Sequence, residues 1–172
     1  GAATMFSSRL PRMSAPSGLR SLTRRLFSTK EEPPKGIPHE KLRVGIPKES
    51  FEGEKRVGIA PASVQLLKKS GFTVVVEDGA GDLAKFQNAK FAEAGAEIAS
   101  GKDVWKSDIV LKIRPPTSAE ASQLKDSAVL YSFLYPGQNK DLVQQLQDKN
   151  VSAFAMECVP RITRAQTFDA LS

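Results

Sequence analysis

The chain has 172 residues, enough for one ordinary domain and too few for a two-domain enzyme with a complete cofactor site. Its formal net charge of +6 would suit a nucleic-acid or anionic-lipid partner, but residues 1–30 hold six basic and no acidic residues, so the remainder is neutral. A single cysteine and a single histidine exclude an intrachain disulfide framework and a multi-cysteine or histidine-rich metal site, and no apolar run reaches the ~18 residues of a membrane span.

Residues 1–30 have the composition of a mitochondrial transit peptide, because they are rich in arginine and serine, lack acidic residues and scatter apolar side chains among the arginines. A secretory signal would need an uninterrupted apolar core, which is absent. The alternative is a disordered basic tail. Residues 31–35 complete a polar linker, so we expect a leader and linker over residues 1–35, no nucleic-acid partner, and a folded body over residues 36–172.

The body alternates short apolar runs with amphipathic segments. Residues 61–71 are a clear helix, with Pro61 in the first turn and Gly71 after the last. Residues 72–77 are β-branched and lie between glycines, which indicates a buried strand. In chain order the sequence predicts strands over residues 42–47, 72–77, 107–113, 128–134 and 151–155, and helices over residues 61–71, 87–95, 119–124 and 139–149.

Strands that alternate with helices of about ten residues favour right-handed βαβ crossovers. We therefore expect an α/β fold, with a doubly wound, mostly parallel sheet and helices on both of its faces. The last residues, 168–172, resemble the opening turn of a helix without a stop signal, so we expect the domain to be incomplete and the sequence to be a fragment.

Phosphate-binding fingerprints are absent. Gly79 and Gly81 follow a strand, but position 84 is alanine and Asp82 stands where a pyrophosphate would lie, so we expect an ordinary loop there. No Walker A sequence, nucleophile elbow or H-E-x-x-H motif occurs.

Charged residues follow two of the predicted strands. Lys48 and Glu49 suggest a surface ion pair, Arg56 either an exposed cation or a contact for an anionic ligand, and Lys112 with Arg114 an exposed strand end. Cys158 is expected to be a small buried apolar side chain rather than a nucleophile, since no histidine lies near it in the sequence.

The densest polar segment is residues 161–172, which follows the last predicted strand. It contains Arg161, Arg164, Gln166, Asp169 and Ser172, so it supplies donors and acceptors that suit an amide-bearing ligand. The alternative is a solvated loop that caps the next helix, and composition alone leaves both open.

Four segments carry a family resemblance: residues 44–49 (V-G-I-P-K-E), 55–61 (K-R-V-G-I-A-P), 132–139 (S-F-L-Y-P-G-Q-N) and 160–172. Over residues 40–172 they resemble the N-terminal domain shared by alanine dehydrogenase and proton-translocating NAD(P) transhydrogenase. The last segment is the most specific and is similar to the NAD(H)-binding component of the transhydrogenase.

The transhydrogenase resemblance implies that Arg161, Asp169 and Ser172 hold the nicotinamide side of NAD(H), and that Gln166 reaches toward the NADP(H) half. These residues would position the rings for hydride transfer from NADH to NADP⁺, with no catalytic residue and no metal in this domain. It further implies NADP(H)-binding and membrane domains elsewhere in the enzyme, a homodimer, proton translocation of the Si-specific, Re-side coupled type, and a place on the matrix side of the mitochondrial inner membrane.

Alanine dehydrogenase is the first alternative. In that family an arginine and a lysine, matched by Arg56 and Lys112, bind the substrate, and a catalytic histidine follows the fourth predicted strand, where this chain has Tyr135. A truncated binding or dimerisation module is the second alternative. Since the resemblance places a Rossmann domain with the adenosine and pyrophosphate contacts after this one, we expect the 172 residues alone to bind NAD weakly or not at all and to be inactive.

Overall fold

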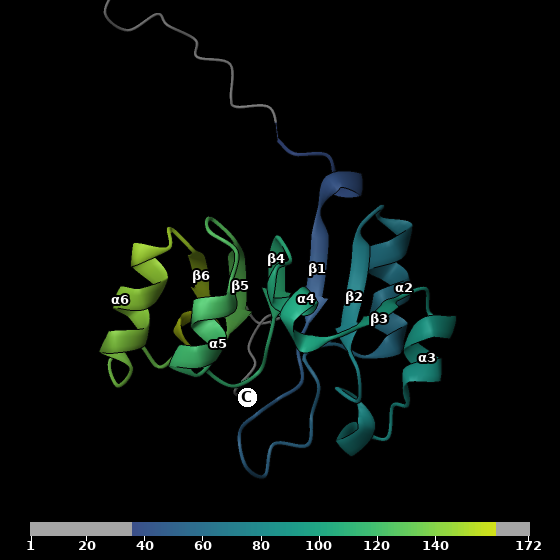
Figure 1. Ribbon diagram of the computed structural model, residues 1–172, viewed down its shortest axis with the longest axis horizontal. Coiled ribbons are helices and arrows are strands. Elements are labelled where there is room, and N and C mark those ends of the chain that lie inside the picture. The colour runs from purple at the N-terminus through teal and green to yellow at the C-terminus, as the bar shows by residue number, and fades with distance from the viewer. Residues whose placement is uncertain (1–35, 161–172) are drawn as a thin grey trace, which may run out of the picture. The chain divides into compact units, whose positions relative to one another are not determined.

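A computed structural model describes residues 36–160. Six strands form one parallel sheet, ordered β3-β2-β1-β4-β5-β6. Figure 1 shows the strands side by side, with the chain entering β1 at the top and a long loop leaving it at the bottom. The strands are β1 (Arg43–Ile46), β2 (Thr73–Glu77), β3 (Glu97–Ala99), β4 (Ile109–Leu111), β5 (Val129–Ser132) and β6 (Ser152–Ala155).

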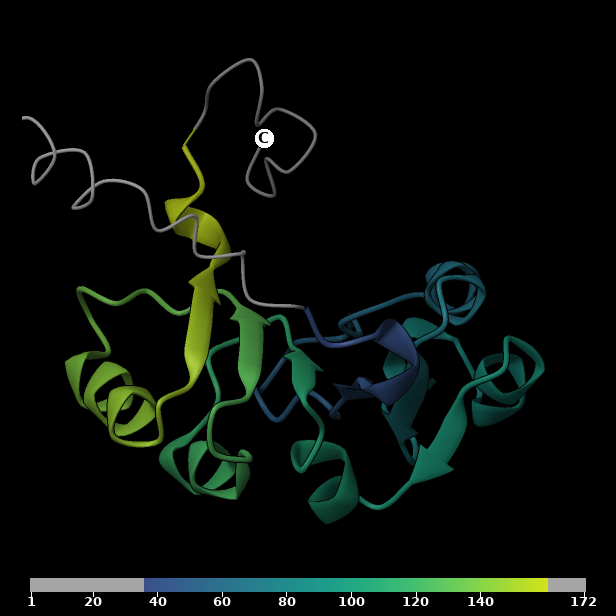
Figure 2. The ribbon, with the colours of Figure 1, turned by 90° about the horizontal axis from the view of Figure 1, so that it is seen from above.

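Helices join the strands and cover both faces of the sheet. Figure 2 shows α4, α5 and α6 on one side and α2 on the other. The helices are α2 (Pro61–Lys69), α3 (Asn88–Glu93), α4 (Gly101–Trp105), α5 (Ser118–Gln123) and α6 (Lys140–Asp148), with short 3₁₀ turns η1 (His39–Lys41), η2 (Asp82–Ala84) and η3 (Met156–Cys158). This arrangement confirms the predicted doubly wound α/β fold, and the sheet is parallel throughout.

The two helix layers enclose separate apolar cores. On one face, Val64 of α2 and Phe91 of α3 pack on β1 and β2. On the other, Trp105 of α4 and Leu146 of α6 belong to the cluster that covers β4 and β5. Strands β1 and β2 are buried along most of their length, whereas β4 and β5 bury alternate residues.

The predicted elements agree with the structure except between α3 and β4. The sequence predicts five strands and no element over residues 96–106, whereas this segment contains β3 and α4. Both elements are too short, at three and five residues, for their apolar residues to show a periodic pattern in the sequence. Strand β3 is also an edge strand with exposed side chains, so it lacks the continuous apolar run that marked β2.

Local sequence explains where the helices begin. Pro61 occupies the first turn of α2, where its missing N–H would have had no helical partner. Thr117 and Glu120 form a capping box at the start of α5, in which each side chain bonds the other residue's backbone amide. Because α5 begins there, the chain between β4 and α5 is short and held close to the sheet edge.

Candidate functional site

The carboxyl ends of the strands form the edge where a ligand would bind. In an open parallel sheet, ligands bind outside these ends where the strand order reverses, which here lies between β1 and β4. The β1–α2 loop, residues 47–60, passes close to the end of β4: a Cβ on Gly58 would lie 2.6 Å from the carbonyl oxygen of Leu111. A glycine is needed there so that the two loops can meet.

Glutamate side chains continue the hydrogen bonding of the sheet beyond the ends of three strands. In each case the carboxylate comes from the exit of a neighbouring strand and accepts backbone amides that no longer have a strand partner. We call these three residues the glutamate caps. Glu77 accepts the amide of Lys48 (2.8 Å), Glu49 accepts those of Ile113 (2.7 Å) and Arg114 (3.2 Å), and Glu157 accepts those of Leu134 (3.1 Å) and Tyr135.

One of these caps belongs to a buried ionic cluster. The Nζ atom of Lys112 lies 3.1 Å from Oε2 of Glu49 and 3.7 Å from Oε1 of Glu120. The Lys112 side chain is 0% exposed and that of Glu49 is 3% exposed. The predicted Lys48–Glu49 surface pair and the predicted exposed strand end at Lys112 are therefore wrong: Glu49 turns inward to a lysine 63 residues away, which local sequence does not reveal.

A second ionic cluster lies nearer to the solvent. The carboxylate of Glu54 accepts two hydrogen bonds from the Arg56 guanidinium, each 2.7 Å long, and one of 2.9 Å from Nε of Arg114. Glu54 is buried, whereas the Arg56 side chain is 63% exposed. Arg56 is exposed, which leaves its predicted role as a contact for an anionic ligand untested, and its buried carboxylate partner two residues earlier was not predicted.

The bonds from Arg56 lower the pKa of Glu54 from 4.5 to about 2, although burial alone would raise it. The same pair raises the pKa of Arg56 above its ordinary value. Glu54 is therefore ionised at neutral pH and serves as a fixed anion between two guanidinium groups. The Arg114 guanidinium also lies 4.9 Å from the ring centre of Phe51, which is exposed at the tip of the β1–α2 loop.

The exit of β5 holds a residue in a rare backbone conformation. Tyr135 has φ of +47°, in the left-handed region that non-glycine residues seldom adopt. Its ring stacks near that of Phe133, with 6.3 Å between the ring centres. Such outliers concentrate at functional sites, where surrounding contacts hold them in place.

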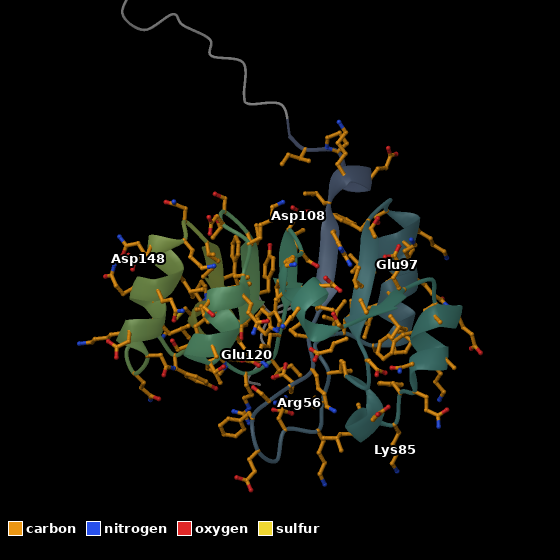
Figure 3. All side chains as sticks on the ribbon, in the orientation of Figure 1. Arg56, Lys85, Glu97, Asp108, Glu120 and Asp148 are labelled. Atoms are coloured by element: carbon orange, nitrogen blue, oxygen red, sulfur yellow. The ribbon has the colours of Figure 1, made fainter. Side chains whose placement is uncertain are left out.

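A pocket of about 670 Å³ opens beside the buried cluster, on the face of the sheet that carries α4 and α5. Glu49 and Glu120 line it together with Glu77, Lys48 and Lys102. Within residues 36–160 no group of three histidine, cysteine or acidic side chains is arranged to hold a metal ion. Figure 3 shows Arg56 and Glu120 at this edge of the sheet.

The structure leaves the predicted cofactor residues untested. Arg161, Gln166, Asp169 and Ser172 all lie outside the described residues. Gly79 and Gly81 lie in a loop that enters η2, as the sequence predicted. Cys158 is exposed, so its predicted burial is wrong: it lies on η3, past the end of β6. No helix in the described part of the chain is long and apolar enough to cross a membrane.

Comparisons with known proteins agree with this fold. The family described as "Alanine dehydrogenase/PNT, N-terminal domain" matches residues 45–172. The NAD(P) transhydrogenase subunit alpha of Haemophilus influenzae is 45% identical over 131 residues, which cover 76% of this chain and 26% of the relative. Alanine dehydrogenase 2 of Staphylococcus aureus is 39% identical over 119 residues, 69% of this chain and 32% of the relative.

Two solved structures share the fold and part of the sequence. The crystal structure of a transhydrogenase from Sinorhizobium meliloti superimposes with a TM-score of 0.71 and 38% identity, covering 74% of this chain and 38% of that one. An L-alanine dehydrogenase superimposes with a TM-score of 0.68 and 33% identity, covering 72% and 34%. The chain spans about a quarter to a third of the length of these curated relatives.

Proposed function

Because the chain belongs to the alanine dehydrogenase/PNT N-terminal domain family, we propose that it forms the first part of the NAD(H)-binding component of a proton-translocating NAD(P) transhydrogenase. The enzyme would transfer hydride from NADH to NADP⁺. Both branches of the family are oxidoreductases by name, so the proposal rests on what separates the transhydrogenase branch from the alanine dehydrogenase branch.

The observation that carries the proposal is Tyr135. It stands at the exit of β5, where the alanine dehydrogenase resemblance requires a catalytic histidine. Alanine oxidation needs a group that accepts and returns a proton near neutral pH, a task for which histidine is the usual side chain and tyrosine is not. Direct hydride transfer between two nicotinamide rings needs no such group, so a tyrosine at this place suits the transhydrogenase reaction.

Lys112 also favours the transhydrogenase branch over the alanine dehydrogenase branch. A lysine that binds substrate must present its ammonium group to the ligand, whereas Lys112 is fully buried between Glu49 and Glu120. Its charge is already balanced by this chain's own carboxylates. A small oxoacid would have to displace one of them and leave it unpaired in the interior, which is unfavourable.

Two backbone amides that follow β1 and β2 are not available to a pyrophosphate. Glu77 accepts the Lys48 amide, and Asn88 Oδ1 accepts the Gly79 amide at 3.1 Å, so these two amides are already bonded within the chain. The nicotinamide supplies the hydride when it is bound. This chain's part would be to hold the ring end with Arg161, Asp169 and Ser172, to direct Gln166 toward the NADP(H) side, and to exclude water.

The proposal extends to the rest of the enzyme. We place the pyrophosphate contacts, the NADP(H)-binding domain and the membrane domain in polypeptide outside these 172 residues, and the assembly as a homodimer with Si-specific, Re-side coupled proton translocation. Residues 1–35 would direct it to the mitochondrial inner membrane on the matrix side, as their composition suggests. The isolated 172 residues would be inactive and would bind NADH weakly in a calorimeter; tight binding would contradict this assignment of contacts.

The test is made on the polypeptide from the complete coding sequence. We expect transfer of hydride from NADH to an NADP⁺ analogue whose reduced form absorbs at its own wavelength, and no alanine-dependent reduction of NAD⁺. Alanine-dependent reduction without transfer to the analogue would overturn the proposal in favour of alanine dehydrogenase. If the polypeptide shows neither activity, the result would favour a binding or dimerisation module.

Two arginines of residues 161–172 test the assigned contacts. Arg161→Ala is expected to slow transfer about tenfold to a hundredfold, because a nicotinamide displaced by about 1 Å reacts that much more slowly. Arg164→Ala removes the same charge from the same segment and should stay near the wild-type rate. Equal losses in both variants would show that the segment contributes general charge and not a specific contact.

A further inference from the structure

Helices cover the two faces of the sheet unequally. Leu130 and Leu134 belong to the core cluster under α4, α5 and α6, and Ala155 packs against it, so these residues mark the covered face at β5 and β6. On the other face, α2 and α3 pack over β1 and β2. Figure 2 shows no α-helix among residues 36–160 on that side of β5 and β6.

Aromatic side chains occupy this half of the second face. Because side chains alternate along a strand, Tyr131 and Phe133 lie on the opposite side from the buried Leu130. Tyr131 pairs in register with Phe154 of β6, and their rings stack with 4.6 Å between the ring centres and 8° between the ring planes. We call Tyr131, Phe133 and Phe154 the aromatic face.

The aromatic face is only partly shielded from water. Phe154 is 49% exposed, and Tyr131 and Phe133 are half-buried. On the side toward β1, Ile109 and Leu111 of β4 already pack against the core under α2 and α3. The aromatic face therefore extends an existing apolar core into the solvent, unlike a single exposed apolar residue, and such contiguous patches mark interaction sites.

The two edge strands of the sheet differ in the same sense. Edge strands are usually protected by charged residues or proline, or are covered by a helix or loop. Strand β3 carries the exposed Glu97, whereas β6, residues 152–155, contains neither a charged residue nor a proline. Strand β6 therefore has the composition of a strand that is covered.

A single α-helix fits the aromatic face. Neighbouring strands lie about 4.8 Å apart, so β4 to β6 span about 10 Å, close to the helix diameter of about 10–12 Å. A strand of four residues, such as β5 or β6, is about 13 Å long, which equals the rise of about nine helical residues. Since parallel sheets occur almost only with helices on both faces, we expect a helix here and not a second sheet.

The described helices have already buried their apolar sides. Val64 of α2, Phe91 of α3 and Leu146 of α6 all lie in the two cores. A second copy of these elements would thus offer mainly polar helix surfaces to the aromatic face. The curated relatives offer another source, because this chain covers only 26% and 32% of two of them, so most of their polypeptide lies outside the matched part.

We propose that the aromatic face is the docking site of an amphipathic helix from polypeptide that follows residue 172 in the same molecule. The helix presents aliphatic side chains, spaced i, i+3, i+4 and i+7, to Tyr131 and Phe154 and keeps its polar side in water. The docking uses none of the proposed cofactor residues, so it holds for a transhydrogenase and for an alanine dehydrogenase alike.

Hydroxyl-radical oxidation of the complete polypeptide tests whether the face is covered, and it needs no variant. The oxidation rate of each side chain is divided by its rate in the unfolded protein. Leu66 of α2 is the matched control, because it is 63% exposed and Phe154 49%. We expect Phe154 to be oxidised at least about tenfold more slowly than Leu66, since packed interiors leave almost no room for water. Similar rates at the two residues would overturn the proposal.

Photocross-linking of the complete polypeptide identifies the segment that covers the face. Phe154 is replaced by p-benzoylphenylalanine, and a control protein carries the same group in place of Leu66. We expect position 154, and not position 66, to cross-link to a peptide beyond residue 172 that has the apolar spacing of a helix, in a product with the mass of one polypeptide. A product of twice that mass would assign the face to a second copy, and a cross-link within residues 1–172 would assign it to this chain; both results contradict the proposal, as does a cross-linked segment without helical spacing.

Discussion

At both the amino and the carboxyl ends of the strands, a carboxylate accepts backbone amides and pairs with a lysine, but the lysine is exposed at one edge of the sheet and buried at the other. At the amino edge, Asp108 accepts the amide of Arg43 at 3.0 Å and pairs with Nζ of Lys125 at 2.6 Å. At the carboxyl edge, Glu49 accepts amides beyond β4 and pairs with Lys112. Each carboxylate accepts a backbone amide at a strand end and forms an ion pair with a lysine. Figure 3 shows Asp108 at the opposite end of the sheet from Arg56 and Glu120.

The difference lies in the lysine. The Lys125 side chain is 55% exposed, whereas that of Lys112 is completely buried. An exposed pair keeps its water and contributes little to stability, while a buried pair must replace the hydration of both ions with fixed partners. The chain places the buried Lys112–Glu49 pair and three glutamate caps at the edge where parallel sheets bind ligands, which indicates that this edge is built to be rigid.

The largest effect is expected from Lys112→Met. Removal of the ammonium leaves Glu49 and Glu120 facing each other without a counter-charge, which should lower the free energy of unfolding by about 3–5 kcal/mol. Urea unfolding of the 172-residue chain at neutral pH measures it. The double variant Lys112→Met, Glu49→Gln should recover part of the lost free energy of unfolding, because it removes one of the two carboxylates that have no counter-charge. A loss below about 1 kcal/mol would mean that the cluster is hydrated and that the two edges do not differ.

A smaller effect is expected at Glu54, whose partner Arg56 is largely exposed. Its pKa of about 2 in the folded chain lies below the usual 4.5, so its stabilisation is fully present above pH 4.5 and is lost as the pH falls toward 2. Linkage gives an upper bound of about 3 kcal/mol, which solvent screening around Arg56 reduces to about 1–2 kcal/mol. Glu54→Gln should be less stable than the wild type by that amount at pH 7.

The pH dependence of unfolding shows whether the stability lost in Glu54→Gln comes from the ionised carboxylate. The gap between the wild type and Glu54→Gln in urea should close progressively between pH 4.5 and pH 2. Asp108 does not confuse the comparison: burial opposes its ionisation, but the bonds from Lys125 and the Arg43 amide outweigh this and lower its pKa equally in both proteins. A gap that stays constant down to pH 2 would attribute the loss to packing and not to ionisation.

The sequence predicted most of the elements that depend on neighbouring residues, apart from the short β3 and α4, and missed the contacts that depend on distant residues. Pro61 and the β-branched run of β2 mark their elements locally, so the parallel fold followed from alternation alone. The bonds of Glu49 to the segment after β4 join residues 63 to 65 positions apart, and no local pattern separates such a glutamate from one at the surface.

The residues of the candidate site were not predicted from local pattern: some came from family resemblance, and others could be found only in the structure. Arg161 and its three companions came from family resemblance, whereas Glu54 and Glu157 became visible only as the acceptors in the fold. A partial signal existed for Glu54, since a carboxylate two residues before an arginine can bond both the backbone and the side chain of that residue, as it does here. Nothing comparable marks Glu157, whose partners Leu134 and Tyr135 follow β5 and lie 22 to 23 positions away.

The smallest effect is expected from Lys125→Met at the amino edge. Asp108 keeps the Arg43 amide and can be hydrated, so the loss of Lys125 should lower the free energy of unfolding by no more than about 1 kcal/mol. That loss should disappear at ~1 M salt, where the screening length falls to about 3 Å, whereas the loss in Lys112→Met should persist because the Lys112 and Glu49 side chains are buried. Paired urea titrations at low and high salt measure both. If Lys125→Met cost as much as Lys112→Met and resisted salt, exposure would not be what separates the two edges, and the rigidity assigned to the carboxyl edge would lose its energetic basis.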